Sequence, residues 1–282
     1  MNVNLPSYHL VFLAFLSGAL FVGASLCRDK DVGLVVESQS LSRVVVNAPT
    51  LAILYGGDRF LAANFETIRL AATGLEGGEA DVAYLMRAQL GVSELNPCHE
   101  DNYYLANGSL TWGGAVKEGN EIVRRAMDCR FWDGVPAFFY GANSFFFNRD
   151  IDESVRALKL SAERWPENAA ALQKLAVMIR VESFNDEQLA LNYLIQQRDS
   201  SRDPQLREML NKRVIRLQGL VELRAAQRRY ESRHGALANF TQLVSSGELV
   251  AIPEDPLRLG YELRNGRIEL RKLNVAGLEE QP

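Results

Sequence analysis

The stretch Val135–Pro166, VPAFFYGANSFFFNRDIDESVRALKLSAERWP, carries the clearest indication of fold in this 282-residue chain. Its apolar side chains recur at intervals of three and four residues, the spacing of one face of an α-helix. Two successive helices are expected, closed by Pro166. Their packing positions are predicted to be Phe138, Ala142 and Phe145 in the first helix, and Leu158 and Ser161 in the second.

Prolines punctuate the chain around this unit, at Pro97, Pro166 and Pro204, and apolar helical segments recur in pairs between them. A helix–turn–helix period of about 34 residues is typical of tetratricopeptide arrays. The pattern over residues 70–204 resembles such an array, in which each helix pair buries its apolar face by stacking on the next. Other units are expected at 100–131 and 169–204. A generic α-helical bundle would produce the same periodicity.

The run Leu10–Leu26 contains 17 residues and no charge, the lower limit for a membrane-spanning helix of roughly 17–25 residues. An uncleaved anchor, a cleaved signal peptide and a lipoprotein signal are the competing interpretations. The lipoprotein interpretation is disfavoured because Leu26, not a small residue, precedes Cys27. We predict a single-pass anchor in the bacterial inner membrane, with the bulk of the chain in the periplasm.

The predicted fold class is mostly α, with a small α+β cap at the C-terminus. The expected organisation is a signal anchor or transmembrane helix (1–30), a linker (31–50), a tetratricopeptide-like helical domain (51–204), a long helix with its cap (205–275) and a tail (276–282).

The C-terminal region begins with a long helix expected from Pro204 to about His234, followed by a short helix near Phe240–Ser245. Arg264-Asn265-Gly266-Arg267 predicts a β-hairpin, because Asn-Gly supplies the two positive φ angles of a type I′ turn. The hairpin should join Tyr261–Leu263 to Ile268–Leu270.

Residues 224–264 resemble the soluble end of type II secretion pseudopilins, although Ala236 and Leu257-Arg258 depart from that pattern and the N-terminus lacks a prepilin motif. The resemblance rests on Tyr230, Gly235, Leu243, Val244, Gly247, Leu249, Pro253, Asp255, Pro256, Gly260 and Tyr261. It implies a role in secretion or pilus assembly. An equally open interpretation is a cap on the last helix, which repeat arrays need. We predict no calcium site, since Glu254 and Asp255 supply few of the six or more oxygens that calcium prefers.

Cys98 and Cys129 should lie at the same end of an antiparallel helix pair, where a disulfide could form. A bonded pair and two free thiols are equally open from the sequence. The adjoining Cys98-His99-Glu100-Asp101 has too few thiols and imidazoles nearby for a zinc site. Glu100 and Asp101 are instead expected to begin a helix, where acidic side chains favour the positive end of the helix dipole.

Two groups of residues are candidates for binding a protein partner. Phe145, Phe146 and Phe147 are consecutive, so they cannot all face the core of a helical domain. Arginines crowd the long C-terminal helix, where a basic surface could meet an acidic partner, although internal ion pairs are the commoner outcome. The candidates are Phe138, Phe139, Phe145, Phe146, Arg224, Arg228 and Arg229.

Composition narrows the function classes. The formal net charge of −4 argues against non-specific nucleic-acid binding. No nucleophile motif, phosphate loop or metal-ligand pattern stands out, so we predict neither an enzyme nor a cofactor, metal or small-molecule substrate. The sequence favours an envelope scaffold that binds protein partners. The alternative is an accessory structural subunit of a larger membrane complex.

Overall fold

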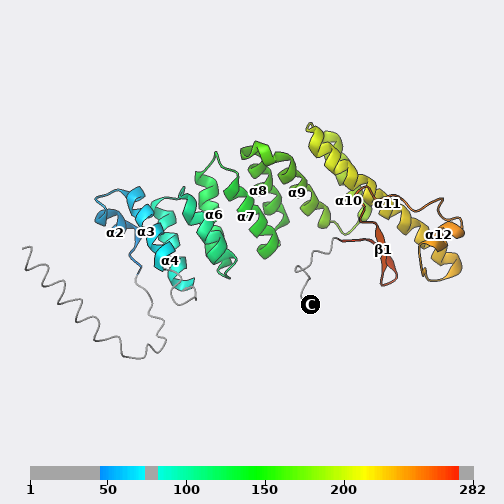
Figure 1. Ribbon diagram of the computed structural model, residues 1–282, viewed down its shortest axis with the longest axis horizontal. Coiled ribbons are helices and arrows are strands. Elements are labelled where there is room, and N and C mark those ends of the chain that lie inside the picture. Colours follow the sequence, from blue (N-terminus) through cyan, green and yellow to red (C-terminus); the bar gives the residue numbers. More distant parts are fainter. Residues whose placement is uncertain (1–44, 74–81, 273–282) are drawn as a thin grey trace, which may run out of the picture. The chain divides into compact units, whose positions relative to one another are not determined.

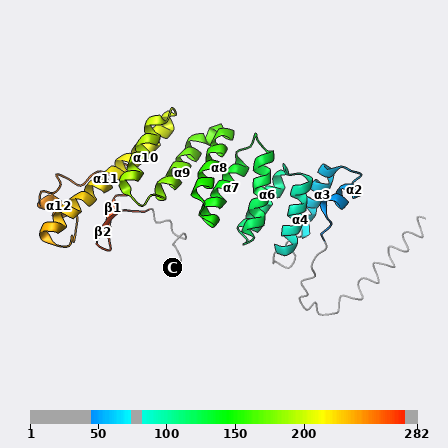
Figure 2. The same ribbon diagram turned by 180° about the vertical axis from the view of Figure 1, so that it is seen from behind.

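The computed structural model describes residues 45–73 and 82–272, and this part of the chain is mostly helical with one two-stranded antiparallel sheet (Figures 1 and 2). The α-helices are α2 (Ala48–Leu54), α3 (Arg59–Thr73), α4 (Val82–Leu95), α5 (Glu100–Leu105), α6 (Val116–Cys129), α7 (Val135–Asn143), α8 (Ile151–Arg164), α9 (Ala169–Glu182), α10 (Glu187–Ser200), α11 (Pro204–His234) and α12 (Thr241–Ser245). Two π-helices, η2 (Ala106–Thr111) and η3 (Ser144–Asn148), extend α5 and α7, and the 3₁₀-helix η4 (Pro166–Asn168) precedes α9. The strands are β1 (Tyr261–Arg264) and β2 (Arg267–Leu270).

Aspartates begin several of these helices. The Asp150 side chain accepts a hydrogen bond from Glu153 N at the start of α8, and Asp203 accepts from the backbone N–H groups of Gln205 and Leu206 at the start of α11. A side-chain oxygen at this position satisfies N–H groups that have no partner inside the helix. Pro204 then occupies the first helical position, where the missing N–H costs nothing.

From α6 to α11, each helix packs against the next helix along the chain. The helix pair predicted over Val135–Pro166 is confirmed as α7 and α8. The small side chains at their contact are Ala137, which is fully buried, and Gly141, where a Cβ would come within 3.0 Å of Leu158. Ala142, the residue predicted there, is partly exposed instead, because the helix presents Gly141 to α8.

The helical body begins within the predicted linker. Its compact unit starts at Val45, and α2 begins at Ala48, with the Asn47 side chain accepting from Thr50 N at 3.0 Å. Pro49 lies in the first turn of that helix and not at the end of an extended segment. The predicted tail, the anchor and residues 31–44 of the linker lie outside the described residues. Within 45–73 and 82–272, no helix is long and apolar enough to cross a membrane.

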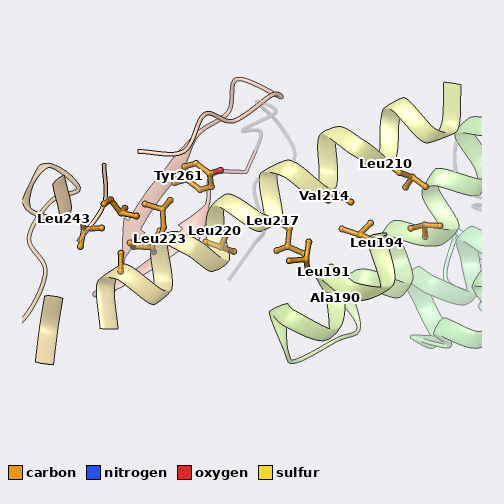
Figure 3. Close-up of a cluster of buried hydrophobic side chains, with 14 of the residues drawn as sticks. Ala190, Leu191, Leu194, Leu210, Val214, Leu217, Leu220, Leu223, Leu243 and Tyr261 are labelled. Atoms are coloured by element: carbon orange, nitrogen blue, oxygen red, sulfur yellow. The ribbon is translucent and has the colours of Figure 1, made fainter. Parts of the chain in front are cut away.

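A single hydrophobic core joins the last helix pair to the C-terminal cap (Figure 3). It contains Leu191 and Leu194 of α10, Leu210 and Leu223 of α11, and side chains of α12 and both strands. The predicted division between residues 204 and 205 therefore falls inside one core, because α11 packs on α9 and α10 along its first half and on the hairpin further on.

The predicted hairpin is confirmed. Tyr261 pairs with Leu270 and Leu263 with Ile268, and the turn residues Asn265 and Gly266 have φ values of 51° and 74°. Successive side chains of a strand point to opposite faces, and in β2 this alternation directs Ile268 toward α11, where it is fully buried in the core.

A buried ion pair holds the loop before the hairpin. Arg216 Nε of α11 lies 3.0 Å from Asp255 Oδ2, and the Asp255 carboxylate also accepts from the backbone N–H groups of Leu257, Leu259 and Gly260. Burial alone would raise the pKa of Asp255, but these backbone hydrogen bonds and the Arg216 charge lower it. The protein thus compensates the buried Asp255 carboxylate of the pseudopilin-like segment.

Gly219 marks the closest approach of the cap to α11. A Cβ at this position would overlap the Tyr261 hydroxyl, whereas Gly91 in the middle of α4 has open space around it. We expect Gly219→Ala to lower the free energy of unfolding by about 1–3 kcal/mol through overpacking. Gly91→Ala should raise it by up to about 1 kcal/mol, because alanine favours the helix. Chemical denaturation measures both, and equal stability of the two variants would contradict this account of the packing.

Candidate functional site

Two π-helices lie side by side near the middle of the chain. η2 and η3 each continue a preceding α-helix, and Asn143 Nδ2, at the end of α7 just before η3, donates to Asn107 Oδ1 of η2 at 2.8 Å. Serine hydroxyls return to the helix backbone here, from Ser109 to Leu105 O at 2.6 Å and from Ser144 to Tyr140 O at 2.8 Å. Such back-bonding bends helices, and π-helical turns, which are rare, frequently occur at functional sites. The local distortion makes this region a candidate site.

An exposed aromatic cluster lies where the π-helices end. Trp112 follows η2, and Phe146 and Phe147 belong to η3, with ring centroids 5.8 Å and 5.0 Å from that of Trp112. Trp112 is 57% exposed and Phe146 53% exposed, and Phe147 is also exposed to solvent. We call these three residues the aromatic edge. Adjoining exposed aromatic rings of this kind are typical of surfaces that bind another molecule.

A groove of about 450 Å³ is formed by residues next to this edge in the sequence. Its lining comes from α6, α7 and the end of η3 and consists of Val116, Lys117, Asn120, Glu121, Arg124, Tyr140 and Asn148. Asn120 is buried, and its Oδ1 has no hydrogen-bond partner. A buried amide oxygen at the edge of a groove can accept a hydrogen bond from a group that enters the groove.

Two charged residues of the groove, Glu121 and Arg124, pair with each other and with neighbours on α6. Glu121 accepts from Arg124 at 2.9 Å and from Arg125 at 2.9 Å, and Arg124 also donates to Asp128. The hydrogen bond from Arg124, more than any other contact, lowers the pKa of Glu121. Burial, assisted by Glu153, raises the pKa of Tyr140, so its hydroxyl stays protonated. This arrangement suits polar recognition of a chain segment, with Asn120 and Tyr140 as hydrogen-bonding groups.

The phenylalanines predicted to bind a partner divide between core and surface. Phe138 and Phe145 pack with Leu158 in one hydrophobic core, and Phe139 packs on Tyr103 in another. Phe138 and Phe145 thus occupy the packing positions predicted for them, and all three half-buried rings stabilise contacts between helices. That these three rings bind a partner stays a prediction. Phe146 is exposed as proposed.

Sequence reasoning missed two members of the aromatic edge. The three consecutive phenylalanines indicated that at least one ring lies on the surface. Two of the rings do so, because Phe147 is exposed as well as Phe146. Trp112 carried no such signal, because its partners lie more than 30 residues away along the chain.

The arginines proposed on α11 mostly serve the fold. Arg224 donates to Ile268 O at 2.7 Å and pairs with Glu187 of α10, so it joins the hairpin to the last helix pair. Arg229 lies 2.9 Å from the buried side chain of Glu248. Arg228 is exposed. Arg224 is thus corrected to a structural residue, and the internal pairing that the sequence left open is the outcome for Arg229.

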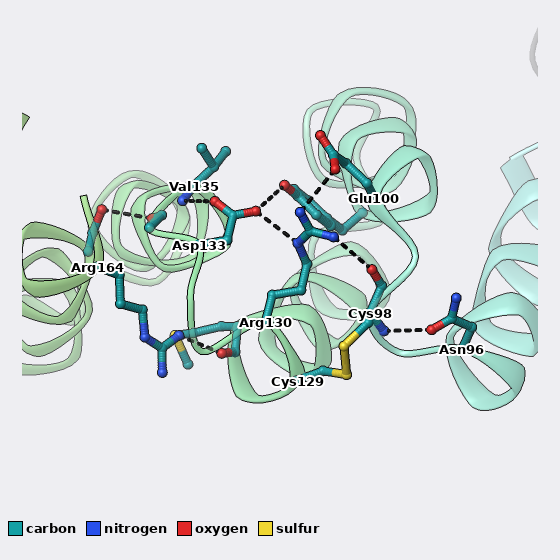
Figure 4. Close-up of polar contacts among 12 residues, drawn as sticks. Asn96, Cys98, Glu100, Cys129, Arg130, Asp133, Val135 and Arg164 are labelled. Carbon is teal, nitrogen blue, oxygen red and sulfur yellow. Dashed lines mark hydrogen bonds and ion pairs between the residues drawn. A yellow bond between two sulfur atoms is a disulfide. The ribbon is translucent and has the colours of Figure 1, made fainter. Parts of the chain in front are cut away.

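A disulfide links Cys98 to Cys129, with 5.3 Å between the Cα atoms (Figure 4). Arg130, the next residue, donates to Cys98 O at 3.1 Å and pairs with Glu100 at 2.9 Å and Asp133 at 2.8 Å. These contacts join the start of α5 to the end of α6 and the turn into α7. They therefore hold α5 and α7, and the π-helices that extend these two helices lead to the aromatic edge.

His99 is not available as a metal ligand through Nδ1. That atom caps α5 by accepting from Asn102 N at 3.4 Å, and burial lowers the pKa of the imidazole. Glu100 and Asp101 occupy the first turn of α5, as predicted. Among the described residues, no group of three or more His, Cys, Asp and Glu side chains could hold a metal ion.

Comparison with known proteins found no matching family model, no matching curated protein and no matching solved structure.

The disulfide should stabilise the α5–α6 pair. Its two cysteines are 31 residues apart, and closing a loop of that size contributes about 3–4 kcal/mol in the loop-entropy account. We expect the double variant Cys98→Ser, Cys129→Ser to lose roughly this free energy of unfolding. A reductant should lower the free energy of unfolding of the unmodified chain by the same amount. It should have no effect on the variant, which lacks the disulfide and serves as the control. Insensitivity of the unmodified chain to reductant would show that the bond contributes nothing.

Asp133 makes this region sensitive to acid. Burial alone would raise the pKa of Asp133, but hydrogen bonds from Val135 N, Arg130 and Tyr103 outweigh that effect and lower it. A carboxyl group whose pKa folding lowers adds stability above its ordinary pKa of about 4, and that stability is lost as the pH falls through the lowered value.

Asp133→Asn should therefore reduce the free energy of unfolding by about 1–3 kcal/mol at neutral pH, since Arg130 and Tyr103 lose a charged acceptor. The difference from the unmodified chain should shrink as the pH is lowered below about 4, where the Asp133 carboxyl group of the unfolded chain takes up a proton, and it should vanish below the lowered pKa of the native carboxyl group. Urea denaturation across that pH range tests this, and a difference that grows in acid would refute it.

Proposed function

We propose that this chain is a membrane-anchored scaffold of the bacterial envelope, which binds a segment of a protein partner at the groove of α6 and α7. The observation that carries the proposal is the aromatic edge of exposed Trp112, Phe146 and Phe147, next in the sequence to residues that line a groove with the buried amide of Asn120. An apolar side chain of the partner would pack on the three rings, and a donor group of the partner would form a hydrogen bond with Asn120 Oδ1.

The packing of the helices supports a scaffold role. Each of the helices from α6 to α11 packs on its neighbours, which is the arrangement that tetratricopeptide-like arrays use to present binding surfaces. Aromatic side chains contribute disproportionately to protein association because they bury large areas at little cost in conformational entropy. We infer recognition of protein in preference to nucleic acid or a small substrate, and no catalytic role.

The disulfide and the apolar N-terminal run support the proposed location. Disulfides persist in oxidising compartments such as the bacterial periplasm. Leu10–Leu26 has the length and composition of a single inner-membrane anchor, with the bulk of the chain outside the cytoplasm. The pseudopilin-like residues 224–264 make secretion or pilus assembly the process in which we propose that the scaffold acts.

A second candidate is an accessory structural subunit of a larger membrane complex. Phe131 and Trp132, in the turn between α6 and α7, form another exposed aromatic pair with ring centroids 4.9 Å apart. Permanent interfaces at both ends of these helices would account for two exposed aromatic groups. Such a subunit should be unstable when purified alone, whereas a scaffold should remain folded.

The aromatic edge can be tested with a matched control. Tagged full-length chain is crosslinked in native membranes and its partners are recovered, for the unmodified protein and for the double variant Trp112→Ser, Phe147→Ser. Loss of hot-spot rings should reduce recovery of a specific partner by about tenfold or more. The variant Phe131→Ser, Trp132→Ser removes as much exposed aromatic surface elsewhere and should leave recovery unchanged. Absence of any partner, or equal recovery with both variants, would contradict the proposal.

A further inference from the structure

The N-terminal helices α2 and α3 expose apolar side chains and bury polar ones. Glu66 and Thr67 are buried on the inner side of α3, next to fully buried Ala62 and Ala63. The outer side carries the large exposed residues. We call this set the α3 face: Ile53, Leu54, Phe60, Leu61, Phe65 and Ile68.

The spacing of the α3 members of this set places them on one side of the helix. Leu61, Phe65 and Ile68 follow one another at intervals of four and three residues, so they line one face of the helix. Tyr55 extends that face by stacking on Phe65 with ring centroids 5.3 Å apart. A helix near the end of an array normally turns a polar side to water, whereas the exposed side of α3 from Phe60 to Ala72 is mostly apolar.

Charge is nearly absent from the α3 face. From Phe60 to Ala72 the exposed residues are Phe60, Leu61, Asn64, Phe65, Ile68, Ala71 and Ala72. Of the two charged residues in that span, Glu66 is buried and forms an ion pair with Arg69. At the start of the helix, the Arg59 guanidinium lies over the Phe60 ring, 4.8 Å from its centroid.

We propose that the α3 face lies on the surface of a lipid bilayer, with its rings and aliphatic side chains among the acyl chains and Arg59 at the headgroups. Amphipathic helices bind membranes in this way, with apolar side chains inserted and basic side chains extending to the phosphates. A protein partner needs about one hydrogen bond per 100–200 Å² of interface, and Asn64 is the one uncharged polar side chain exposed on α3 from Phe60 to Ala72.

The chain before α2 makes the contact geometrically possible. This inference rests on the proposed anchoring of Leu10–Leu26 in the membrane. Residues 27–44 join that run to Val45, and 18 residues span at most about 60 Å. Tethering at that range raises the local concentration of the α3 face at the bilayer, so weak insertion suffices.

Site-specific photocrosslinking in the full-length chain tests the contact. The photoreactive p-benzoylphenylalanine replaces Phe65 or, separately, Ile68, and the control replaces Val250, which is 98% exposed and lies far along the chain. After irradiation of intact bacterial membranes, mass spectrometry should detect phospholipid adducts at Phe65 and Ile68 in several-fold excess over the control. Adducts to a second copy, to residues 1–44 or to another protein, or yields equal to the control, would overturn the proposal.

Carbonate extraction of the same membranes separates this inference from the proposed function. A chain that stays in the membrane pellet without lipid adducts at Phe65 or Ile68 keeps its anchor and refutes the bilayer contact alone. A chain released from the pellet refutes the anchor and, with it, the contact that depends on the anchor.

Discussion

In the helical body from α6 to α11, helices bury their apolar faces largely against the helices next to them in the sequence. The rest of the structure depends on this packing between successive helices. Small residues lie where two helices come closest, and the helix sides that face away from a neighbour are exposed. Ala137 and Gly141 let α7 approach α8, and Gly219 lets the C-terminal cap approach α11. On the outer side of α3, where no other element of the described residues covers the helix, apolar side chains remain in contact with solvent. Binding surfaces are then expected at the places where stacking ends or is distorted.

The two π-helices show how local distortion creates such a surface. Ser109 and Ser144 compete with the normal helical hydrogen bonds, and the Asn107–Asn143 bond stabilises the widened turns against each other. The extra residue in a π-helical turn changes the direction of the side chains that follow. Trp112 and Phe147 are exposed at these turns, whereas Phe138 and Phe145 are half-buried against a hydrophobic core. A regular helix would have kept the three-and-four spacing that buries apolar residues.

Arginine has a mainly structural role in the described part of the chain. Arg130 joins three segments beside the disulfide, Arg216 neutralises buried Asp255, and Arg224 connects the hairpin to α10. Planar guanidinium groups with several donors can satisfy carbonyl and carboxylate oxygens from different elements at once. The surplus of basic residues on α11 is therefore largely used within the fold, and the exposed aromatic groups are better candidates for binding.

Local rules determined much of this protein from its sequence. Helical periodicity predicted the α7–α8 pair, Pro204 and the basic last turn delimited α11, and Asn265-Gly266 specified the hairpin, because each depends on residues close together in the chain. The sequence left the state of Cys98 and Cys129 open. It proposed Phe138, Phe139, Phe145 and Arg224 as partner-binding residues, although Phe138 and Phe145 also fitted packing positions. Tertiary structure decided these points, since burial depends on which distant residue lies opposite. Trp112 meets Phe147, Arg224 meets Ile268, and Tyr261 meets Gly219 through the packing of helices and hairpin, which no local pattern encodes.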